Sequence, residues 1–434
     1  MASANSTVQP LNLEGSSVSE NGISTIDGGG VTSARGFKAA GVHAGFRKDP
    51  GRLDLALVVA DEPAACAATF TQNIFCAAPV TVSREHLEGD SHGCARALVV
   101  NSGVANAATG DIGLENARET ARIVSNVVGC PENEVMVAST GVIGVHLPME
   151  FFESGVPQAW NACSLDGGSA AARAIMTTDT HPKEFAVSFA GDDVGYPGCV
   201  FTVGGMSKGS GMIMPNMATM IACLTTDAPL ASDVLREVLV GVVGKTFNRV
   251  TVDSDTSTND SCYLFASGAA ASGSPVFARG SAALEKFERA LSAVCTSLAR
   301  AMASDGEGAT RLVTVHVAGA ANDADADKAA RTIANSPLVK TAIFGHDANW
   351  GRIAAAAGRS GAAFEQSAVD IDIMGMPVCR NGLAIAFDEE EALRRFERPE
   401  IVIDIDLGAG HSSTTLWTCD FSHDYVTING DYRT

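Results

Sequence analysis

The chain lacks the features that mark secreted, membrane-spanning and nucleic-acid-binding proteins. Its eleven cysteines include no Cys-x-x-Cys pair and no Cys/His cluster at metal-ligand spacing. No apolar run reaches the roughly 18 residues that a membrane-spanning helix needs. Basic residues are few, 30 against 50 acidic ones, and the net charge of −20 argues against nucleic acid or an anionic membrane as partner. Small-molecule chemistry is therefore the expectation.

The N-terminal segment also lacks a recognisable targeting signal. Residues 1–30 are rich in Ser, Asn and Gly and show no basic start followed by an apolar stretch and a small-residue cleavage site. We therefore expect this segment to be disordered and the protein to be cytoplasmic, with its cysteines reduced.

Strand and helix patterns alternate along the chain, which predicts a mixed α/β (α+β) fold of layered sheets and helices. Apolar runs that end near glycine or a polar turn predict buried strands over residues 55–60, 97–101 and 135–139. One-sided apolar periodicity predicts helices over 114–128, over 234–242 behind an N-cap at Ser232, and over 281–302.

The pattern changes after Gly308, and the change predicts a second, smaller domain. Strands are expected over 312–317 and 401–407, with a turn over 321–327 and a helix from about Lys328, and the chain closes with a strand-like start at Tyr425. We expect a main catalytic domain over residues 31–311, a smaller α/β domain over 312–412, and a C-terminal tail over 413–434 that returns to the active site.

Two glycine-containing segments approximate nucleotide-binding loops without fitting either motif. Residues 241–246 look like a phosphate-binding loop, but Leu239 stands where that motif requires glycine, so a helix is expected there. The glycines between 204 and 211 lack the third glycine of a dinucleotide loop, because Met214 holds its place. Neither a cofactor nor a metal is expected.

The Ala218-Thr219 step is the most informative feature of the chain. It lies in a run with two glycines, one proline and a single charge, Lys208. A Thr hydroxyl needs a base to act as a nucleophile, and cleavage of the preceding bond would free the α-amino group of Thr219 for that role. The reference pKa of an α-amine, roughly 7.7 to 8.0, allows the neutral form near pH 7 at modest cost. A lone Thr after Ala is usually an ordinary helix or strand residue, so its neighbours carry the hypothesis.

An acyl group on Thr219 could pass to an amine or to water, and either route needs donors for the tetrahedral oxyanion, each worth roughly 3 kcal/mol. Ser139-Thr140-Gly141, after the strand that begins at Val135, offers hydroxyls and an unhindered N–H. The alternative is an ordinary strand-ending turn, which the residues by themselves favour.

The run Lys208-Gly-Ser-Gly-Met-Ile-Met-Pro-Asn-Met-Ala-Thr219-Met resembles the self-cleavage and nucleophile segment of the ornithine acetyltransferase family. Further segments resemble family segments in the same order, from about residue 31 to the end; they include residues 31–39, 54–57, 69–73, 77–80, 139–144, 177–179, 247–253, 255–260, 305–310 and 349–352.

The resemblance implies an enzyme of arginine synthesis that transfers acetyl from N2-acetylornithine to glutamate, giving ornithine and N-acetylglutamate. Some members also accept acetyl-CoA as donor. The two cleaved chains, residues 1–218 and 219–434, would stay together and assemble as two of each. By motif match, Ala218 and Thr219 resemble the cleavage site, Thr219 the nucleophile, and Thr140 and Gly141 the oxyanion hole; the substrate-binding residues would be Thr177, Lys208, Thr219, Glu307, Asn429 and Thr434.

Each carried role has an ordinary alternative. Lys208 could hold a substrate carboxylate or be a solvated surface residue, and Glu307 could pair with an amino group of ornithine or face water. Thr177 could bind substrate or cap a turn, while Asn429 and Thr434 would fray unless the C-terminus folds back.

Two positions depart from the family pattern. Val104 stands where Asn is expected and Ser254 where Gly is expected, which removes a hydrogen-bonding side chain and restricts the backbone, respectively.

Two other functions remain open: a self-processed amidase or aminopeptidase that uses water as acceptor, and a catalytically silent protein that serves as an assembly module.

Overall fold

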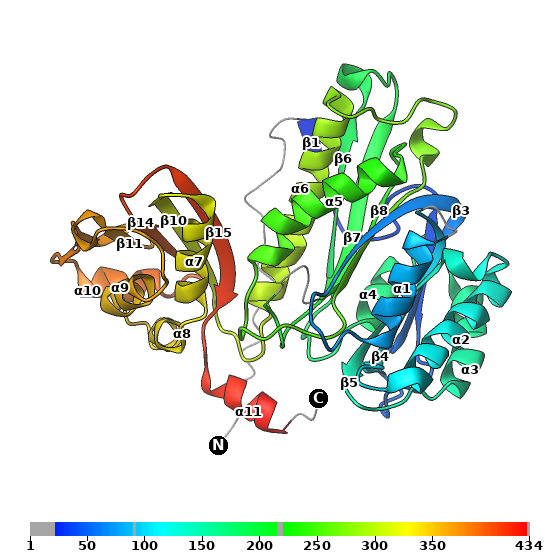
Figure 1. Ribbon diagram of the computed structural model, residues 1–434, viewed down its shortest axis with the longest axis horizontal. Helices are drawn as coiled ribbons and strands as arrows, with labels where there is room; N and C mark the ends of the chain where they lie inside the picture. The colour runs from blue at the N-terminus through cyan, green and yellow to red at the C-terminus, as the bar shows by residue number, and fades with distance from the viewer. Residues whose placement is uncertain (1–21, 90–92, 215–219, 432–434) are drawn as a thin grey trace. The chain divides into compact units, whose positions relative to one another are not determined.

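The computed structural model describes residues 22–89, 93–214 and 220–431, which form two units (Figure 1). Residues 22–248 and 256–298 build the nine-stranded unit, and residues 249–255 and 299–431 build the six-stranded unit. Each combines one sheet with several helices, so the expected mixed α/β fold is confirmed. The predicted cut, Ala218-Thr219, and Thr434 lie outside the described residues.

The nine-stranded unit contains the sheet that carries most of the predicted site. Its strands are β1 (Ile23–Thr25), β2 (Phe37–Val42), β3 (Leu55–Phe70), β4 (Cys94–Val104), β5 (Val135–Val142), β6 (Lys183–Ala190), β7 (Val200–Lys208), β8 (Ile221–Thr226) and β9 (Ser261–Ala266). Its helices are α1 (Ala78–Glu88), α2 (Gly110–Val128), α3 (Glu150–Ala162), α4 (Gly168–Ala174), α5 (Ser232–Lys245) and α6 (Ala282–Ser304), the last of which runs on into the other unit.

The strand order is β1-β6-β7-β8-β9-β3-β4-β5, with β2 paired to β3. The β4–β5 and β8–β9 pairs are parallel and the other pairs are antiparallel. Alternate residues of β3 point to opposite faces: Leu55 and Leu57 pack with α1, α2 and α3, whereas Ala56 and Val58 pack with α4. The sheet is thus covered on both faces, which explains why its strands read as continuous apolar runs.

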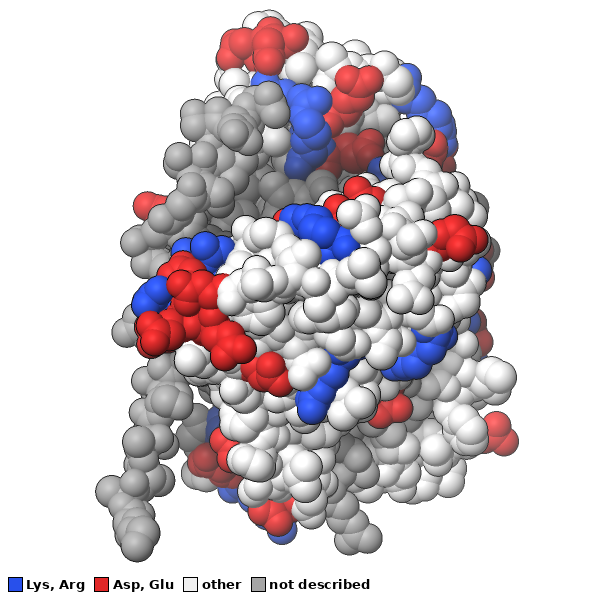
Figure 2. Space-filling view, turned by 90° about the vertical axis from the view of Figure 1, so that its left-hand side faces the viewer, with Lys and Arg blue, Asp and Glu red and all other residues white. Residues whose placement is uncertain are grey.

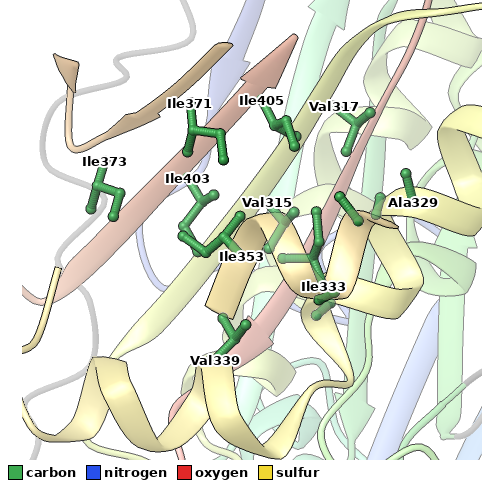
Figure 3. Packing of buried hydrophobic residues seen from close by; sticks show 14 of the residues in the cluster. Val315, Val317, Ala329, Ile333, Val339, Ile353, Ile371, Ile373, Ile403 and Ile405 are labelled. Carbon is green, nitrogen blue, oxygen red and sulfur yellow. The ribbon is translucent and has the colours of Figure 1, made fainter. Parts of the chain in front are cut away.

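The six-stranded unit has the order β13-β12-β11-β14-β10-β15. Its strands are β10 (Leu312–Ala320), β11 (Asp370–Ile373), β12 (Met376–Arg380), β13 (Leu383–Ala384), β14 (Glu400–Asp406) and β15 (Ser412–Cys419), and its helices are α7 (Asp323–Ala334), α8 (Pro337–Phe344), α9 (Trp350–Gly358), α10 (Glu389–Arg395) and α11 (His423–Asp431). Figure 3 shows the core of this unit, where branched side chains of β10, β11 and β14 meet α7 and α9.

Most of the strands and helices that the apolar patterns predict are present in the structure. The runs at 55–60, 97–101 and 135–139 lie in β3, β4 and β5, and the three long helical patterns are α2, α5 and α6. Residues 241–245 are part of α5, so the rejected phosphate loop is a helix. The N-cap expectation for α5 is wrong by one residue, because the cap is Ala231 and Ser232 opens the helix.

Three other expectations need correction. Residues 1–30 are not disordered throughout, because β1 pairs with β6, with Ile23 opposite Phe189. The turn expected over 321–327 is the start of α7, where the Asn322 side chain accepts a hydrogen bond from the Asp325 N–H. The strand-like start at Tyr425 belongs to α11, because the Asn429 side chain bonds back to the Tyr425 carbonyl at 3.0 Å and the Tyr425 ring stacks on Phe421.

The structure also groups the chain differently from the domain boundaries expected. Residues 299–311 and 413–431 belong to the six-stranded unit. The reason for the second range is the sheet itself, since β15 is hydrogen-bonded along β10, with Val313 opposite Thr418.

The face that Figure 2 shows carries charged side chains of both signs. Basic side chains are dispersed there among acidic and uncharged ones. All eleven cysteines are unpaired. Across residues 22–89, 93–214 and 220–431, no helix is long and apolar enough to cross a membrane.

Candidate active site

The segment that carries the predicted cut is the connection between two neighbouring strands. β7 ends at Lys208, which lies opposite Ile221 of β8, so residues 209–220 join the two strands. The described ends of this connection rest on the same part of the chain. The Thr256 hydroxyl donates to the Met214 carbonyl at 3.0 Å, and the Ser261 N–H donates to the Met220 carbonyl at 2.8 Å.

The predicted oxyanion residues lie at the end of β5, beside the end of β4. Thr140 is opposite Ser102 and Gly141 is opposite Gly103 in this parallel pair. Both glycines have positive φ, +118° at Gly103 and +131° at Gly141, and a Cβ on Gly141 would lie 2.3 Å from the Gly103 carbonyl carbon. The expectation of a turn directly after the strand is therefore wrong, because β5 continues to Val142 with an irregular register.

Asn259 connects these two regions, and it was assigned no role from the sequence. Its side chain is 6% exposed, and its Nδ2 donates to the Ser139 carbonyl at 2.8 Å and to the Ala105 carbonyl at 2.6 Å. Its Oδ1 accepts from the Thr258 hydroxyl at 2.6 Å. Residues 256–261 therefore hold both the cut-bearing connection and the residue before Thr140. The sequence offered one signal for this residue. Asn259 lies within the segment 255–260, which resembles a family segment.

Thr177 and Lys208 are also buried in this unit, at 9% and 8% exposure. The solvated alternative for Lys208 is therefore wrong. Asp179 was also assigned no role from the sequence. Its carboxylate accepts from the Thr177 N–H at 2.9 Å, from the Gly209 N–H at 2.7 Å and from Lys183 Nζ at 2.7 Å. Burial alone would raise the pKa of Asp179, but the charges of Lys183 and Lys208 and these hydrogen bonds hold it well below its usual range.

Glu307 and Asn429 form a pair in the six-stranded unit. Glu307 is 8% exposed in the loop after α6, so the water-facing alternative is wrong, and its Oε2 accepts from Asn429 Nδ2 at 2.8 Å. Asn429 lies on α11, whose start is tied to the same loop because the Ser422 hydroxyl donates to the Gly308 carbonyl at 2.5 Å. The described part of the C-terminus is thus folded, with an amide and a carboxylate side by side.

The two departures from the family pattern are accommodated locally. Val104 is buried, and its carbonyl accepts from Asn101 Nδ2 at 2.9 Å. Ser254 has a φ of +69°, a conformation that glycine adopts without strain. In the β4–β5 pair Val104 lies opposite Thr140 and Val142, so this departure adjoins a predicted oxyanion residue.

The described residues offer hydroxyls, backbone donors and buried charges suited to acyl transfer. They contain no group of three or more His, Cys, Asp or Glu side chains that could hold a metal ion. Hydroxyl and N–H donors of this kind can stabilise an oxyanion, and buried charges can bind charged amino-acid groups; the predicted nucleophile, Thr219, lies outside the described residues.

Comparison with known proteins agrees with this chemistry. Residues 38–434 match the ArgJ family. The arginine biosynthesis bifunctional protein ArgJ of Symbiobacterium thermophilum is 47% identical over 94% of this chain and 99% of its own length, and that of Thermosynechococcus vestitus is 45% identical over 94% and 98%. The solved ornithine acetyltransferase of Mycobacterium tuberculosis, in complex with ornithine, is 40% identical over 45% of this chain and 100% of that chain, with a TM-score of 0.40. The chain therefore belongs to the ArgJ family, the ornithine acetyltransferases of arginine biosynthesis.

Proposed function

We propose that the protein transfers acetyl from N2-acetylornithine to glutamate by a ping-pong mechanism on Thr219, giving ornithine and N-acetylglutamate. The observation that carries the proposal is the anchoring of both ends of the connection 209–220 on residues 256–261, whose Asn259 also holds Ser139 beside Thr140. This arrangement supports a nucleophile and oxyanion donors that are held by one short stretch of chain.

Self-cleavage comes first. The Thr219 hydroxyl attacks the Ala218 carbonyl carbon, the amide C–N bond breaks and an ester forms between the two residues. Water then opens the ester, which leaves residues 1–218 and 219–434 and a free α-amine on Thr219. This amine serves as the general base for the hydroxyl of the same residue.

Acetyl transfer follows on the freed Thr219. Its α-amine takes the hydroxyl proton as the oxygen attacks the acetyl carbonyl of N2-acetylornithine, and the developing oxyanion accepts hydrogen bonds from the Thr140 hydroxyl and the Gly141 N–H. The C–N bond breaks, ornithine leaves with the proton, and acetyl-Thr219 remains. The amine of glutamate attacks the ester, the C–O bond breaks, and the proton returns to the Thr219 hydroxyl. Acetyl-CoA would acylate the same hydroxyl.

Substrate recognition falls to the charged and polar residues carried by the motif match. Lys208 binds a substrate carboxylate and Thr177 a neighbouring polar group, while Glu307 pairs with a substrate amine; Asn429 and Thr434 complete the set. The two chains assemble as two of each in the cytoplasm, where the eleven unpaired cysteines fit a reducing medium.

Intact-mass measurement tests the cleavage step. We expect two fragments whose masses total the 44.6 kDa chain plus one water, and a single chain from Thr219→Ala. Thr332→Ala, which changes a helix threonine of the six-stranded unit, is the matched control and should be cleaved like the wild type. A wild-type chain that stays whole and inactive would instead favour the silent assembly module.

Ornithine release from N2-acetylornithine, measured with and without glutamate, tests the transfer step. Release that depends strictly on glutamate supports the transferase, whereas release at the same rate in water alone supports the amidase. Formation of N-acetylglutamate from acetyl-CoA by the cleaved protein decides whether that donor is used.

A further inference from the structure

Asp179 binds two segments that the strand order brings together. β6 begins at Lys183, opposite Ser207 near the end of β7, so the residues before β6 and after β7 lie at the same end of this antiparallel pair. The Asp179 carboxylate accepts from the N–H of Thr177 on the first segment and from the N–H of Gly209 on the second. Gly209 is the first residue of the connection that carries the predicted cut.

An ion pair alone does not account for this geometry. The side chains of Asp179 and Lys183 are both 0% exposed, and Lys183 Nζ donates to Asp179 Oδ1. The same Oδ1 accepts from Gly209, and Oδ2 accepts from the Thr177 N–H and, at 3.5 Å, from the Thr177 hydroxyl. Hydrogen bonds to an ionised acceptor are shorter and about twice as strong as neutral ones, so both segments are held firmly.

The charge of Asp179 also acts on Lys208, which adjoins Gly209 in the chain. Lys208 is 8% exposed, and its electrostatic interaction with Asp179 is among those that stabilise the ionised carboxylate. A buried cation is costly without a nearby anion, and the ionised Asp179 supplies one. One carboxylate therefore accepts hydrogen bonds from Thr177 and Gly209 and interacts electrostatically with Lys208.

We propose that Asp179 is a positioning residue that sets the places of Thr177, Lys208 and the start of the cut-bearing connection, and so governs both self-cleavage and substrate binding. The inference rests on the proposed function. It assigns Asp179 no contact with the reacting atoms.

The test compares three variants. The first, the buried double variant, combines Asp179→Asn with Lys183→Met, and the second is Asp179→Glu. The third is a control that combines Asp233→Asn with Arg279→Met in an exposed pair. The first double variant removes the buried Asp179–Lys183 pair as a whole, so Lys183 is not left as a buried charge without its partner. The control removes an ion pair of 2.8 Å from the same unit. Each protein is followed for thermal unfolding, for cleavage by intact mass over time, and for kcat and KM once cleavage is complete.

If Asp179 positions these segments, the buried double variant folds but is cleaved at least 10-fold more slowly than the wild type and the control. After cleavage its KM for N2-acetylornithine rises about 10-fold, the loss expected for one charge-assisted contact, while kcat falls less. Asp179→Glu recovers part of the cleavage rate, because it restores a carboxylate displaced by one methylene.

Wild-type cleavage and KM in a folded buried double variant would overturn the inference. Failure of both Asp179 variants to fold would also overturn it, in favour of a purely structural role. A wild type that is neither cleaved nor active defeats the proposed function itself, whereas an active wild type matched by the buried double variant defeats the inference alone.

Discussion

Gly141→Ala should disturb the predicted oxyanion hole more than any other substitution that adds one methyl group to residues 139–144. A Cβ at this position would lie 2.3 Å from the carbonyl carbon and 2.7 Å from the Cα of Gly103, against the 3.4 Å of ordinary contact. Both neighbours are backbone atoms, so the ends of β4 and β5 must separate by about 1 Å, a displacement that can cost roughly 100-fold in catalysis.

The expected magnitudes follow from strain and misplacement. Overpacking costs about 1–3 kcal/mol and an unfavourable backbone conformation about 1–3 kcal/mol, so Gly141→Ala should lose about 2–6 kcal/mol of unfolding free energy. Loss of one oxyanion donor lowers kcat by about 100- to 1,000-fold. The variant should therefore unfold at a lower temperature and show kcat/KM reduced by at least 100-fold.

Gly144→Ala is the matched control within the same motif. Gly144 also has a positive φ, +80°, but no atom lies within 4 Å of a Cβ built there. It should lose only the left-handed strain of about 1–2 kcal/mol and keep its activity. Circular dichroism on heating and the rate of acetyl transfer to glutamate measure both effects. Equal melting temperatures and equal kcat/KM for the two variants would refute the reasoning.

Three further outcomes are expected. Ser254→Gly should raise the unfolding free energy by up to about 1 kcal/mol. It relieves left-handed strain of about 1–2 kcal/mol, and the greater conformational freedom of glycine in the unfolded chain offsets part of this gain. A denaturation midpoint below that of the wild type would contradict this. The pKa of Asp179 is low in the fold, so its ionised form stabilises above the unfolded pKa of about 3.9 and that stability is lost as pH falls below this value. The wild type should therefore lose more unfolding free energy between pH 6 and pH 2 than the charge-free pair Asp179→Asn with Lys183→Met, and parallel profiles would contradict it. Asn429→Ala should raise KM for N2-acetylornithine about 10-fold by removing the donor to Glu307, with kcat changed less; Thr427→Ala, on the exposed face of α11, is the control, and equal KM values for the two would contradict the role.

Local patterns in the sequence predicted the elements whose stability is itself local or strongly apolar. The runs that became β3, β4 and β5, and the one-sided helices α2, α5 and α6, follow from side-chain periodicity. The same reasoning failed at Tyr425, where β-branched neighbours suggested a strand. The stacking of Tyr425 on Phe421 and the tie between Ser422 and Gly308 accompany a helix there, which shows how tertiary contacts override propensity.

Site residues divide in the same way. Thr140, Gly141, Thr177 and Lys208 could be named because their motifs are short and contiguous. Asn259 and Asp179 could not be assigned roles, because each acts through hydrogen bonds to segments far along the chain: Asn259 to Ser139, 120 residues away, and Asp179 to Gly209, 30 residues away. Separations of this size leave no periodic trace in a single sequence.

The sequence by itself determined the family of this protein, because the segments that resemble the family are short runs of contiguous residues. Only the tertiary structure decided which buried side chains hold those residues in place. Asn259, just before β9, donates to Ser139 of β5, and Asp179, before β6, accepts from Gly209, just after β7; both contacts depend on the folding of distant segments into one sheet.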